Sequence, residues 1–438
     1  MEQTIIAKAI KNLGFEKVNE MQEASLEANR EHADVVLISP TGSGKTVGFL
    51  LPLLEKLNPE QKGVQALIIC PSRELALQIE QVFKKMGTGY KINSCYGGHS
   101  MKTERNNLSE APAVLVGTPG RLADHVTRES VELQFVHTLV LDEFDKALEL
   151  GFKKDMAFII EQLVSLDKRM LTSATQALKI PPFTGVVEHK KLNFTKDVIP
   201  VKLTLKKVVA SGKDKLQSLF ELVCKFGNES TLIFCNHRDA VDRISDLLWD
   251  QGLFHESFHG GLEQDDRERA LLKFRNGSHH ILICTDLASR GLDIPEIKHV
   301  IHYQLPVQEE AFIHRNGRTA RMNAEGTAYL VFGENEKYPE YIKDKIAVER
   351  LPEATVLPKE PKFTTLYIGG GKKDKINKID IVGLLMKKGG LEKDEVGLIE
   401  VHDFSSYVAV SKEKVEDVIK KLKGEKVKKK KLKIAQSK

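Results

Sequence analysis

The stretch that decides the fold is VVLISPTGSGKT, residues 35–46. An apolar run of β-forming residues passes directly into a turn with two glycines, which leads into the helix-forming segment VGFLLPLLEKL, residues 47–57. Glycines let successive backbone N–H groups wrap around anionic oxygens, and the start of the following helix adds its dipole. This order of strand, glycine turn, Lys-Thr and helix predicts a parallel-sheet domain with a phosphate-binding loop.

Each residue type in this loop has an expected task. Lys45 should bridge the β- and γ-phosphates of a nucleotide, and the Thr46 hydroxyl should hold Mg²⁺. Ser39 stands where the first glycine of G-x-x-x-x-G-K-T is usual. A glycine-rich turn without a ligand is the alternative, which the order of the elements disfavours. The expected phosphate-binding set is Thr41, Gly42, Ser43, Gly44, Lys45 and Thr46.

A second chemical signal is LVLDEFDKALELGF, residues 139–152. A nucleotide-hydrolysing protein with such a loop needs an acid at the end of a neighbouring parallel strand to hold the metal. Asp142 is the candidate for Mg²⁺, and Glu143 is the candidate for activating the attacking water. An acidic strand end alone is more often a solvated turn, but SPTGSGKT upstream reverses that preference. The Phe144 ring is expected to turn into the packing between sheet and helix.

The alternation of β-rich runs with helical patterns extends through most of the chain. Apolar strand-like runs lie at 35–39, 66–70, 113–118, 138–143 and 169–175, and again at 230–236, 279–286, 299–306 and 326–332. Continuous apolar strands separated by helices predict parallel sheets covered on both faces. The expected fold class is α/β, with one domain over 1–198, a second over 199–350, a linker over 351–362 and a small α+β domain over 363–438.

Composition is that of a multi-domain soluble protein, with 438 residues, 41% hydrophobic and 29% charged. No apolar run is long enough to span a membrane and no signal peptide is evident, so a cytoplasmic location is expected. Five cysteines without C-x-x-C spacing, mostly within strand-like runs, indicate reduced core thiols. Residues 361–438 carry 20 lysines against 11 acidic residues, which concentrates positive charge at the C-terminus. A lysine-rich solubilising tail is the alternative.

Seven ordered segments resemble the motif series of the DEAD-box ATP-dependent RNA helicases. The resemblance covers roughly residues 14–333 and implies two RecA-like domains that close on ATP and RNA. GFEKVNEMQ, residues 14–22, is similar to the family's adenine-reading element, which implies that Gln22 bonds adenine and Phe15 stacks near it. The segments are PSREL (71–75), GG (97–98), TPGR (118–121), DEFD (142–145), SAT (173–175), TDLASRGLD (285–293) and HRNGRTAR (314–321).

The same resemblance implies roles for individual residues. Arg318 and Arg321 would be arginine fingers for the γ-phosphate, and Asp293 would lie near the ribose. The alternative for HRNGRTAR is a cationic helix start that pairs with surface acids. Ser173 and Thr175 would bond Asp145 and so couple the nucleotide site to RNA. Sequence-independent grip on RNA phosphates is implied for Pro71, Arg73, Gly98, Thr118, Gly120, Arg121, His259, Gly260, Gln264, Arg267, Thr285 and Arg290.

The C-terminal piece shows the pattern strand, helix, strand, strand, helix, strand, with the last strand expected at 430–435. It resembles the RNA-recognition-motif domain of the bacterial DbpA group of DEAD-box proteins, which binds large-subunit ribosomal RNA. A protein-binding ferredoxin-like domain is the alternative. Base stacking is expected from Tyr367 and Tyr407, and basic contacts from Lys372, Lys373, Lys375 and the run 428–431.

The expected function is that of an ATP-dependent RNA helicase or RNA–protein remodelling ATPase that bends and separates short duplexes, in large ribosomal subunit assembly. ATP and Mg²⁺ are the expected cofactors and RNA the expected partner, with no membrane partner and a monomeric chain. The alternative is a nucleotide-gated RNA-binding assembly factor that clamps RNA with little unwinding. The sequence favours the enzyme, because it contains Lys45, Asp142, Glu143, Arg318 and Arg321.

Overall fold

The computed structural model divides into two compact units between Val201 and Lys202. Five residues with expected roles, Thr41, Thr175, Arg290, Asp293 and Arg321, lie outside the residues it describes. The described residues are 2–40, 42–98, 100–174, 179–195, 203–210, 214–289, 297–319, 326–334, 336–342, 345–352, 354–428 and 430–437.

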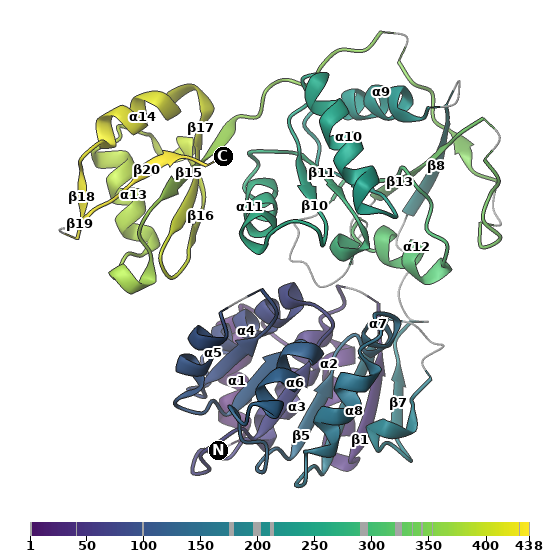
Figure 1. Cartoon of the computed structure of the whole chain (residues 1–438), viewed down its shortest axis with the longest axis vertical. Helices are drawn as coiled ribbons and strands as arrows, with labels where there is room; N and C mark the ends of the chain where they lie inside the picture. Colours follow the sequence, from purple (N-terminus) through teal and green to yellow (C-terminus); the bar gives the residue numbers. More distant parts are fainter. Residues whose placement is uncertain are drawn as a thin grey trace. The chain divides into compact units, whose positions relative to one another are not determined.

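The first unit is built on a parallel sheet (Figure 1). Its strands are β1 (Asp34–Ile38), β2 (Ala66–Ile69), β3 (Ile92–Cys95), β4 (Val114–Gly117), β5 (Thr138–Leu141), β6 (Lys168–Ser173) and β7 (Lys190–Asn193). Their order is β3-β4-β2-β5-β6-β1-β7. Parallel strands need a crossover between them, and the helices supply it. The carboxyl ends of β1, β6 and β5 therefore meet at one edge, which brings the phosphate loop and the Asp142 turn together.

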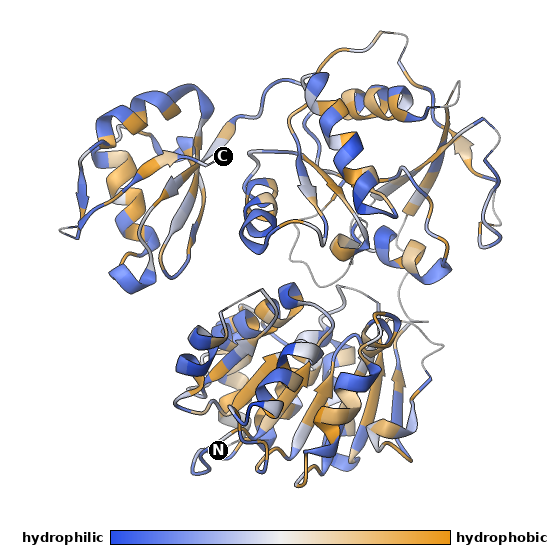
Figure 2. Cartoon of the chain, in the orientation of Figure 1, coloured by the Kyte–Doolittle hydropathy of each residue, from blue (hydrophilic) through white to orange (hydrophobic). Residues whose placement is uncertain are grey.

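Helices cover both faces of this sheet because successive strand residues point to opposite sides. On β2, Ala66 and Ile68 join one core while Leu67 and Ile69 join the other. Figure 2 shows hydrophobic residues along the strands and hydrophilic residues on the outer helix surfaces. The helices are α1 (Glu2–Leu13), α2 (Glu20–Glu31), α3 (Lys45–Lys56), α4 (Arg73–Met86), α5 (Met101–Leu108), α6 (Pro119–Thr127), α7 (Phe144–Glu149) and α8 (Lys153–Glu161), with a 3₁₀ turn η1 (Pro182–Thr184).

The second unit contains another parallel sheet, in which the strands lie side by side in the order β10-β11-β9-β12-β13-β8-β14. Alternate residues of its inner strands pack against α9 and α10. The elements are β8 (Leu203–Val209), α9 (Leu216–Phe226), β9 (Thr231–Phe234), α10 (Arg238–Asp250), β10 (Glu256–Phe258), α11 (Gln264–Arg275), β11 (Ile281–Cys284), η2 (Asp286–Ser289), β12 (His299–His302), α12 (Glu309–Asn316), β13 (Gly326–Phe332) and β14 (Ala347–Val348).

The C-terminal part of the second unit is an antiparallel sheet with two helices on one face, ordered β16-β17-β15-β20. The strand expected at 430–435 is wrong as a single element. Lys430 and Lys431 pair back on Lys426 and Val427, and only then does the last sheet strand begin. The elements are β15 (Phe363–Ile368), η3 (Lys372–Asp374), α13 (Lys378–Lys387), η4 (Lys393–Glu395), β16 (Val396–Val401), β17 (Ser406–Ser411), η5 (Lys412–Lys414), α14 (Val415–Leu422), β18 (Lys426–Val427), β19 (Lys430–Lys431) and β20 (Ile434–Gln436).

Polar contacts within the second unit link the C-terminal sheet to the end of α11. Thr365 Oγ1 accepts from Asn276 Nδ2 and lies 2.8 Å from Ser278 Oγ, and Arg275 pairs with Glu400 at 3.0 Å. Thr365 shares its sheet face with Tyr367, since residues two apart on a strand point the same way. The tyrosine-bearing face of the sheet therefore adjoins α11.

Two expectations about burial are confirmed. All five cysteines are free and buried in the cores. The Phe144 side chain is fully buried in the core beneath the acidic turn, with its ring centroid 6.3 Å from that of Phe183. Within the described part of the chain, no helix has both the length and the apolar character needed to cross a bilayer.

Phe144→Ala should cost stability far more than catalysis. Removing a fully buried ring leaves a cavity, and such truncations cost about 3–5 kcal/mol of unfolding free energy. ATP turnover by the protein that remains folded should change little, because the ring packs among the apolar side chains of the core. Thermal melting and phosphate release measured on one preparation test this. Phe158→Ala, at a more exposed ring on α8, is the control. A collapse of hydrolysis at an unchanged melting temperature would contradict the prediction.

His302 should make the second unit sensitive to acid. Burial, aided by the Arg315 charge, lowers the pKa of His302 to about 3, while the hydrogen bond to Asn316 Oδ1 opposes this. An unfolded histidine titrates near 6.5. As pH falls below about 6.5 the unfolded chain binds a proton that the folded chain refuses, so stability is lost by about 1.4 kcal/mol per pH unit until pH nears the folded pKa.

His302→Gln keeps an N–H donor but does not titrate, so its unfolding free energy should fall less between pH 7 and pH 5 than that of the parent chain. Urea unfolding followed by the fluorescence of Trp249, the only tryptophan, reports on α10 of the same unit. His237→Gln, at an exposed position, is the control. Equal pH dependence in parent and His302→Gln chains would refute the assignment.

Candidate nucleotide and RNA site

The phosphate loop depends on its glycines. Gly42 and Gly44 have φ of +85° and +89°, a left-handed conformation that glycine adopts without steric cost. Gly44 is the N-cap of α3, and a Cβ there would lie 2.6 Å from Gln22 Nε2. A side chain at Gly44 would therefore be strained by the backbone turn, and its Cβ would force the Gln22 amide to shift.

The polar groups of this loop fit a bound phosphate chain. Lys45 is buried, and its Nζ donates to the carbonyl oxygens of Ser39 at 2.7 Å and Pro40 at 2.9 Å. Ser43 Oγ is buried with no hydrogen-bond partner among the described residues. Thr46 lies half-buried in the first turn of α3. A buried ammonium, an orphan hydroxyl and a helix start together suit an anionic ligand.

The expected adenine-reading element, residues 14–22, is tied to the phosphate loop by side-chain amide groups. Asn19 and Gln22 form a capping box, in which Asn19 Oδ1 accepts from Gln22 N at 2.9 Å and Gln22 Oε1 accepts from Asn19 N at 3.1 Å. Gln22 Nε2 then donates to Gly44 O, and Asn19 Nδ2 donates to Ser43 O. Sequence reasoning missed Asn19, although N-x-x-Q before a helix is a known capping pattern. Phe15 is about half exposed, at 49%.

Asp142 follows β5 and is almost completely buried. The Thr172 hydroxyl on β6 donates to Asp142 Oδ1, and Glu143 N–H donates to the same oxygen at 3.1 Å. Burial raises the pKa of Asp142, although the Thr172 hydrogen bond and the Lys45 charge act to lower it. Thr172 was not expected from sequence. Its position offered a signal, because Thr172 directly precedes the Ser-Ala-Thr segment on β6, the strand that pairs with β5.

Glu143 has a strained backbone. Its φ of 46° and ψ of 49° place a residue with a Cβ in the left-handed region, which costs on the order of 1–2 kcal/mol. The conformation is held by hydrogen bonds from Glu143 N–H to Asp142 Oδ1 and to Thr172 Oγ1, both at 3.1 Å. Strained backbone conformations of this kind are found most often at active sites and ligand-binding sites. Glu143 is thus turned out of line with the strand directly beside Asp142.

The residues expected to couple RNA to the nucleotide are only partly described by the structure. Asp145 lies in the first turn of α7, where its Oδ1 accepts from Lys146 N at 3.0 Å. Ser173 ends β6, is buried, and its carbonyl accepts from Ser39 N at 3.1 Å. The backbone of the SAT segment therefore touches the start of the phosphate loop. The side-chain bond from Ser173 to Asp145 stays a prediction.

The expected RNA contacts of the first unit gather at three adjacent strand ends. Pro71 and Arg73 follow β2, Gly98 follows β3, and Thr118 begins α6 after β4. Gly98 has φ +84°, and a Cβ there would lie 2.4 Å from Arg73 Nη1, so the GG loop packs on that arginine. Within α6, which Thr118 caps, Gly120 is exposed, and Arg121 donates to Glu104 Oε2 at 2.9 Å.

The HRNGRTAR segment contains one arginine with a structural role that sequence reasoning did not assign. Arg315 is fully buried and donates to Asp286 Oδ1 at 2.6 Å, Gln304 O at 2.7 Å and Asn236 Oδ1 at 2.8 Å. These partners follow β11, β12 and β9, so Arg315 braces three strand ends of the second sheet. Arg318 is also buried, just beyond the end of α12.

The other described RNA candidates of the second unit lie after strands β10 and β11 and on α11. His259 Nδ1 accepts from Gly261 N, which assigns the ring proton to Nε2 and lets it donate to Asp242 Oδ1 at 2.9 Å. Gly260 beside it is exposed. Thr285 follows β11, and its N–H donates to Phe258 O. On α11, Gln264 Oε1 accepts from Arg267 Nη2 at 2.8 Å.

The C-terminal domain divides its charged and aromatic groups unevenly. Tyr367 and Tyr407 are cross-strand partners with ring centroids 5.5 Å apart. Lys372 and Lys373 are exposed. Lys428 instead pairs with Asp380 at 2.8 Å. Lys430 likewise pairs with Asp374. Phe404, in the β16–β17 turn, is 72% exposed. Sequence reasoning missed Phe404, for which an aromatic residue between two strands was the signal.

Comparison with known proteins matches three regions of the chain. Residues 19–181 match the DEAD/DEAH box helicase family, 214–323 the helicase conserved C-terminal domain and 365–436 the DbpA RNA binding domain. The ATP-dependent RNA helicases DbpA of Bacillus subtilis and Escherichia coli are 32% and 33% identical. These alignments cover 98% and 96% of this chain, and 96% and 94% of the relatives.

Solved structures of RNA helicases resemble a large part of the chain. S. cerevisiae Dbp5 bound to RNA and ADP BeF3 superposes with a TM-score of 0.67 at 28% identity, over 76% of this chain and 88% of that one.

Proposed function

The chain belongs to the DEAD-box family of ATP-dependent RNA helicases, and from that premise we propose how its residues divide the work. It is an ATP-hydrolysing RNA helicase. The observation that carries the proposal is the meeting of the Gly42–Lys45 loop with the Asp142–Glu143 turn at one edge of the first sheet.

In the first unit, the loop N–H groups and Lys45 would neutralise the β- and γ-phosphates. Mg²⁺, held through Thr46 and Asp142, would supply positive charge where the transferred phosphoryl group becomes more negative. Glu143 would accept the proton of the attacking water. Thr41 and Ser43 would complete the phosphate loop. At the other end of the nucleotide, Phe15 and Gln22 would contact the base.

The second unit would complete the site when it closes on the first. Arg318 and Arg321 would stabilise the γ-phosphate in the transition state, and Asp293 would contact the ribose. An arginine finger contributes about 10³ to 10⁵ in rate, so closure would act as the switch for hydrolysis. Ser173, Thr175 and Asp145 would report RNA binding to the nucleotide.

RNA would be gripped by its backbone on both units, so binding would not depend on sequence. The first unit would use the residues after β2, β3 and β4, from Pro71 to Arg121. The second would use His259, Gly260, Gln264, Arg267, Thr285 and Arg290. Closing both grips on one strand would bend it and separate a short duplex.

The domain over 363–438 would tether the enzyme to a structured RNA, with 1–198 and 199–350 as the helicase domains and 351–362 as the linker. The match to the DbpA RNA binding domain supports this tether. Large-subunit ribosomal RNA is the proposed target, and large-subunit assembly in the cytoplasm the proposed setting, for a monomeric chain. Lys372, Lys373 and Phe404 are the leading contacts, because Lys428 and Lys430 are already ion-paired.

A nucleotide-gated clamp with little unwinding remains the second candidate. It needs the phosphate loop and the RNA contacts but not a water-activating base. The strained, tightly held backbone at Glu143 favours hydrolysis over a passive clamp.

Glu143→Gln should lower RNA-stimulated ATP hydrolysis by about 10² to 10⁴, the usual contribution of a general base. ATP binding should persist, because the amide keeps the size of the carboxylate and the phosphate contacts are untouched. Phosphate release with and without RNA, beside nucleotide-binding titrations, measures both. Glu149→Gln, an exposed change at the end of the helix that Glu143 precedes, is the control. Unchanged hydrolysis in Glu143→Gln would remove the assigned role, and no hydrolysis in the parent chain would favour the clamp.

Deleting 361–438 should abolish preference for a ribosomal RNA fragment but keep stimulation by generic RNA. The double change Lys372→Glu with Lys373→Glu should weaken binding to the fragment in the same direction, because two exposed cations become anions. Lys387→Glu with Lys388→Glu makes the same charge change at the end of α13 as a control. Competition binding with the fragment against unrelated RNA measures the preference. Equal preference before and after truncation would sink the tether.

A further inference from the structure

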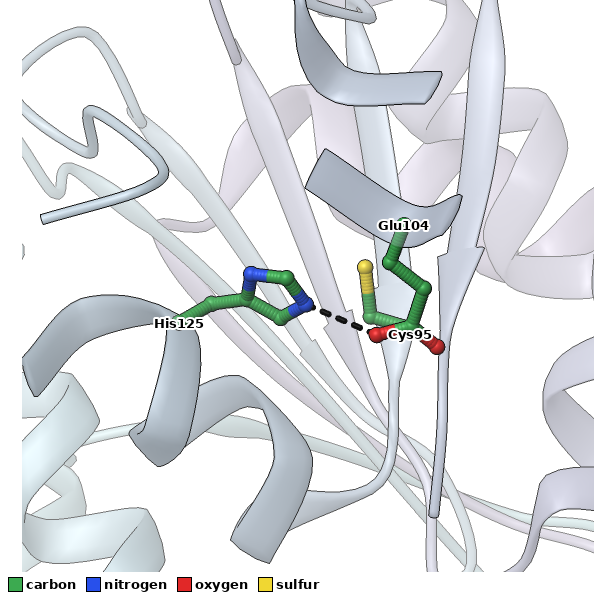
Figure 3. A group of neighbouring side chains, drawn as sticks. All are labelled: Cys95, Glu104 and His125. Atoms are coloured by element: carbon green, nitrogen blue, oxygen red, sulfur yellow. Dashed lines mark hydrogen bonds and ion pairs between the residues drawn. The ribbon is translucent and has the colours of Figure 1, made fainter. Parts of the chain in front are cut away.

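A buried polar group lies beside the RNA-facing strand ends of the first unit. It consists of Cys95 at the end of β3, Glu104 in α5 and His125 in the last turn of α6, with potential ligand atoms within 4.8 Å of one another. Figure 3 shows the Glu104 carboxylate and the His125 ring pointing at each other, with the Cys95 sulfur alongside. None of the three belongs to the motif series that the resemblance identified.

Glu104 is the centre of this group. Its Oε1 accepts from Tyr96 N at 3.2 Å, and its Oε2 accepts from Arg121 Nη1 at 2.9 Å and lies 2.8 Å from His125 Nε2. The residue is only 2% exposed, and a carboxylate so buried needs such partners. Burial by itself raises the pKa of Glu104, but His125, Tyr96 N–H and Arg121 outweigh it and the pKa is lowered.

His125 is held from both sides. Its Nε2 faces Glu104, and its Nδ1 lies 2.7 Å from Ser130 Oγ. The Ser130 hydroxyl is also within 3.1 Å of the His125 carbonyl oxygen. The ring is completely buried, so it cannot turn without breaking both contacts. His125 thus fastens the end of α6 to Glu104, one helical turn beyond Arg121.

The three residue types are metal ligands in other settings, but the contacts favour a hydrogen-bond network here. Glu104 Oε2 already faces a guanidinium, whose positive charge would repel a metal ion. Burial raises the pKa of the Cys95 thiol, and the Glu104 charge adds to this effect. A metal needs the thiolate.

We propose that Glu104 is a positioning residue for RNA binding. Its carboxylate joins the GG loop, through Tyr96 N–H, to the TPGR helix, through Arg121 and His125. Because a guanidinium carries its donors in one rigid plane, fixing one of them by Glu104 fixes the direction of the rest. Arg121 is thereby set before RNA arrives, which reduces the ordering that binding requires. The inference rests on the proposed function, in which Arg121 contacts RNA.

Glu104→Gln in the full chain isolates this role. The amide keeps the size of the carboxylate and can still accept from Tyr96 N–H, but its NH₂ group cannot accept from Arg121. The RNA concentration that half-saturates ATP hydrolysis should rise roughly tenfold, as loss of a hydrogen bond to a charged group implies. The turnover number at saturating RNA should change far less, and so should the melting temperature.

A double-mutant cycle with Arg121→Ala separates positioning from a general structural effect. If Glu104 acts through Arg121, Glu104→Gln adds nothing to the half-saturating RNA concentration once Arg121 is alanine. Additive weakening in the double variant would overturn the inference. Arg121→Ala without any effect on RNA would instead show that the proposed RNA contact itself is wrong.

Cys95→Ala and metal analysis test the competing interpretation. The positioning role predicts that Cys95→Ala leaves RNA half-saturation within about twofold, because Glu104 takes its hydrogen bonds from other groups. Stoichiometric zinc in the purified full chain, lost in both Cys95→Ala and Glu104→Gln together with RNA affinity, would establish a metal site and refute the positioning role.

Discussion

A carboxylate withdrawn from water needs donors arranged around it, because an unpaired buried charge costs several kcal/mol. That requirement organises the edge of the first sheet. Asp142 draws the Thr172 hydroxyl and the Glu143 N–H, and this bends the chain at Glu143. Glu104 draws Tyr96 N–H and Arg121, and this joins two loops. In the second unit the buried charge is positive, and the Arg315 guanidinium is surrounded by acceptors, among them Asp286 and Asn236. The groups proposed for catalysis and for RNA binding are thus placed by the hydrogen-bond partners that buried charges require.

The sheet architecture follows from local patterns. Apolar strands, glycine turns and helical spacing are short-range features, so VVLISPTGSGKT alone indicates a strand, a loop and a helix in order. The burial of Phe144 was predictable for the same reason, since a bulky ring beneath a strand end has few other places to go. The last C-terminal strand was misjudged because the apolar pattern of KKLKIA does not reveal that Lys428 turns the chain with φ of 46°. That turn forms a hairpin before the strand begins.

The partners of site residues were much harder to predict. Gln22 bonding to Gly44, and Arg121 bonding to Glu104, join residues 22 and 17 positions apart, and no periodicity links them. Charge counts also mislead. The C-terminal lysines sum to a strong positive charge, yet Lys428 and Lys430 form ion pairs with Asp380 and Asp374 within the domain. The positive surface that remains for RNA is smaller than composition suggests.

The contact of Gln22 with Gly44 has a consequence for substrate selection. Through the hydrogen bonds from Gln22 to Gly44 O and from Asn19 to Ser43 O, the element that would meet the base is tied directly to the loop that would hold the phosphates. A nucleotide with an ill-fitting base would therefore disturb the alignment of its own γ-phosphate. Discrimination among nucleoside triphosphates would then show itself in turnover as well as in affinity, because these hydrogen bonds link the base contact to the phosphate contacts.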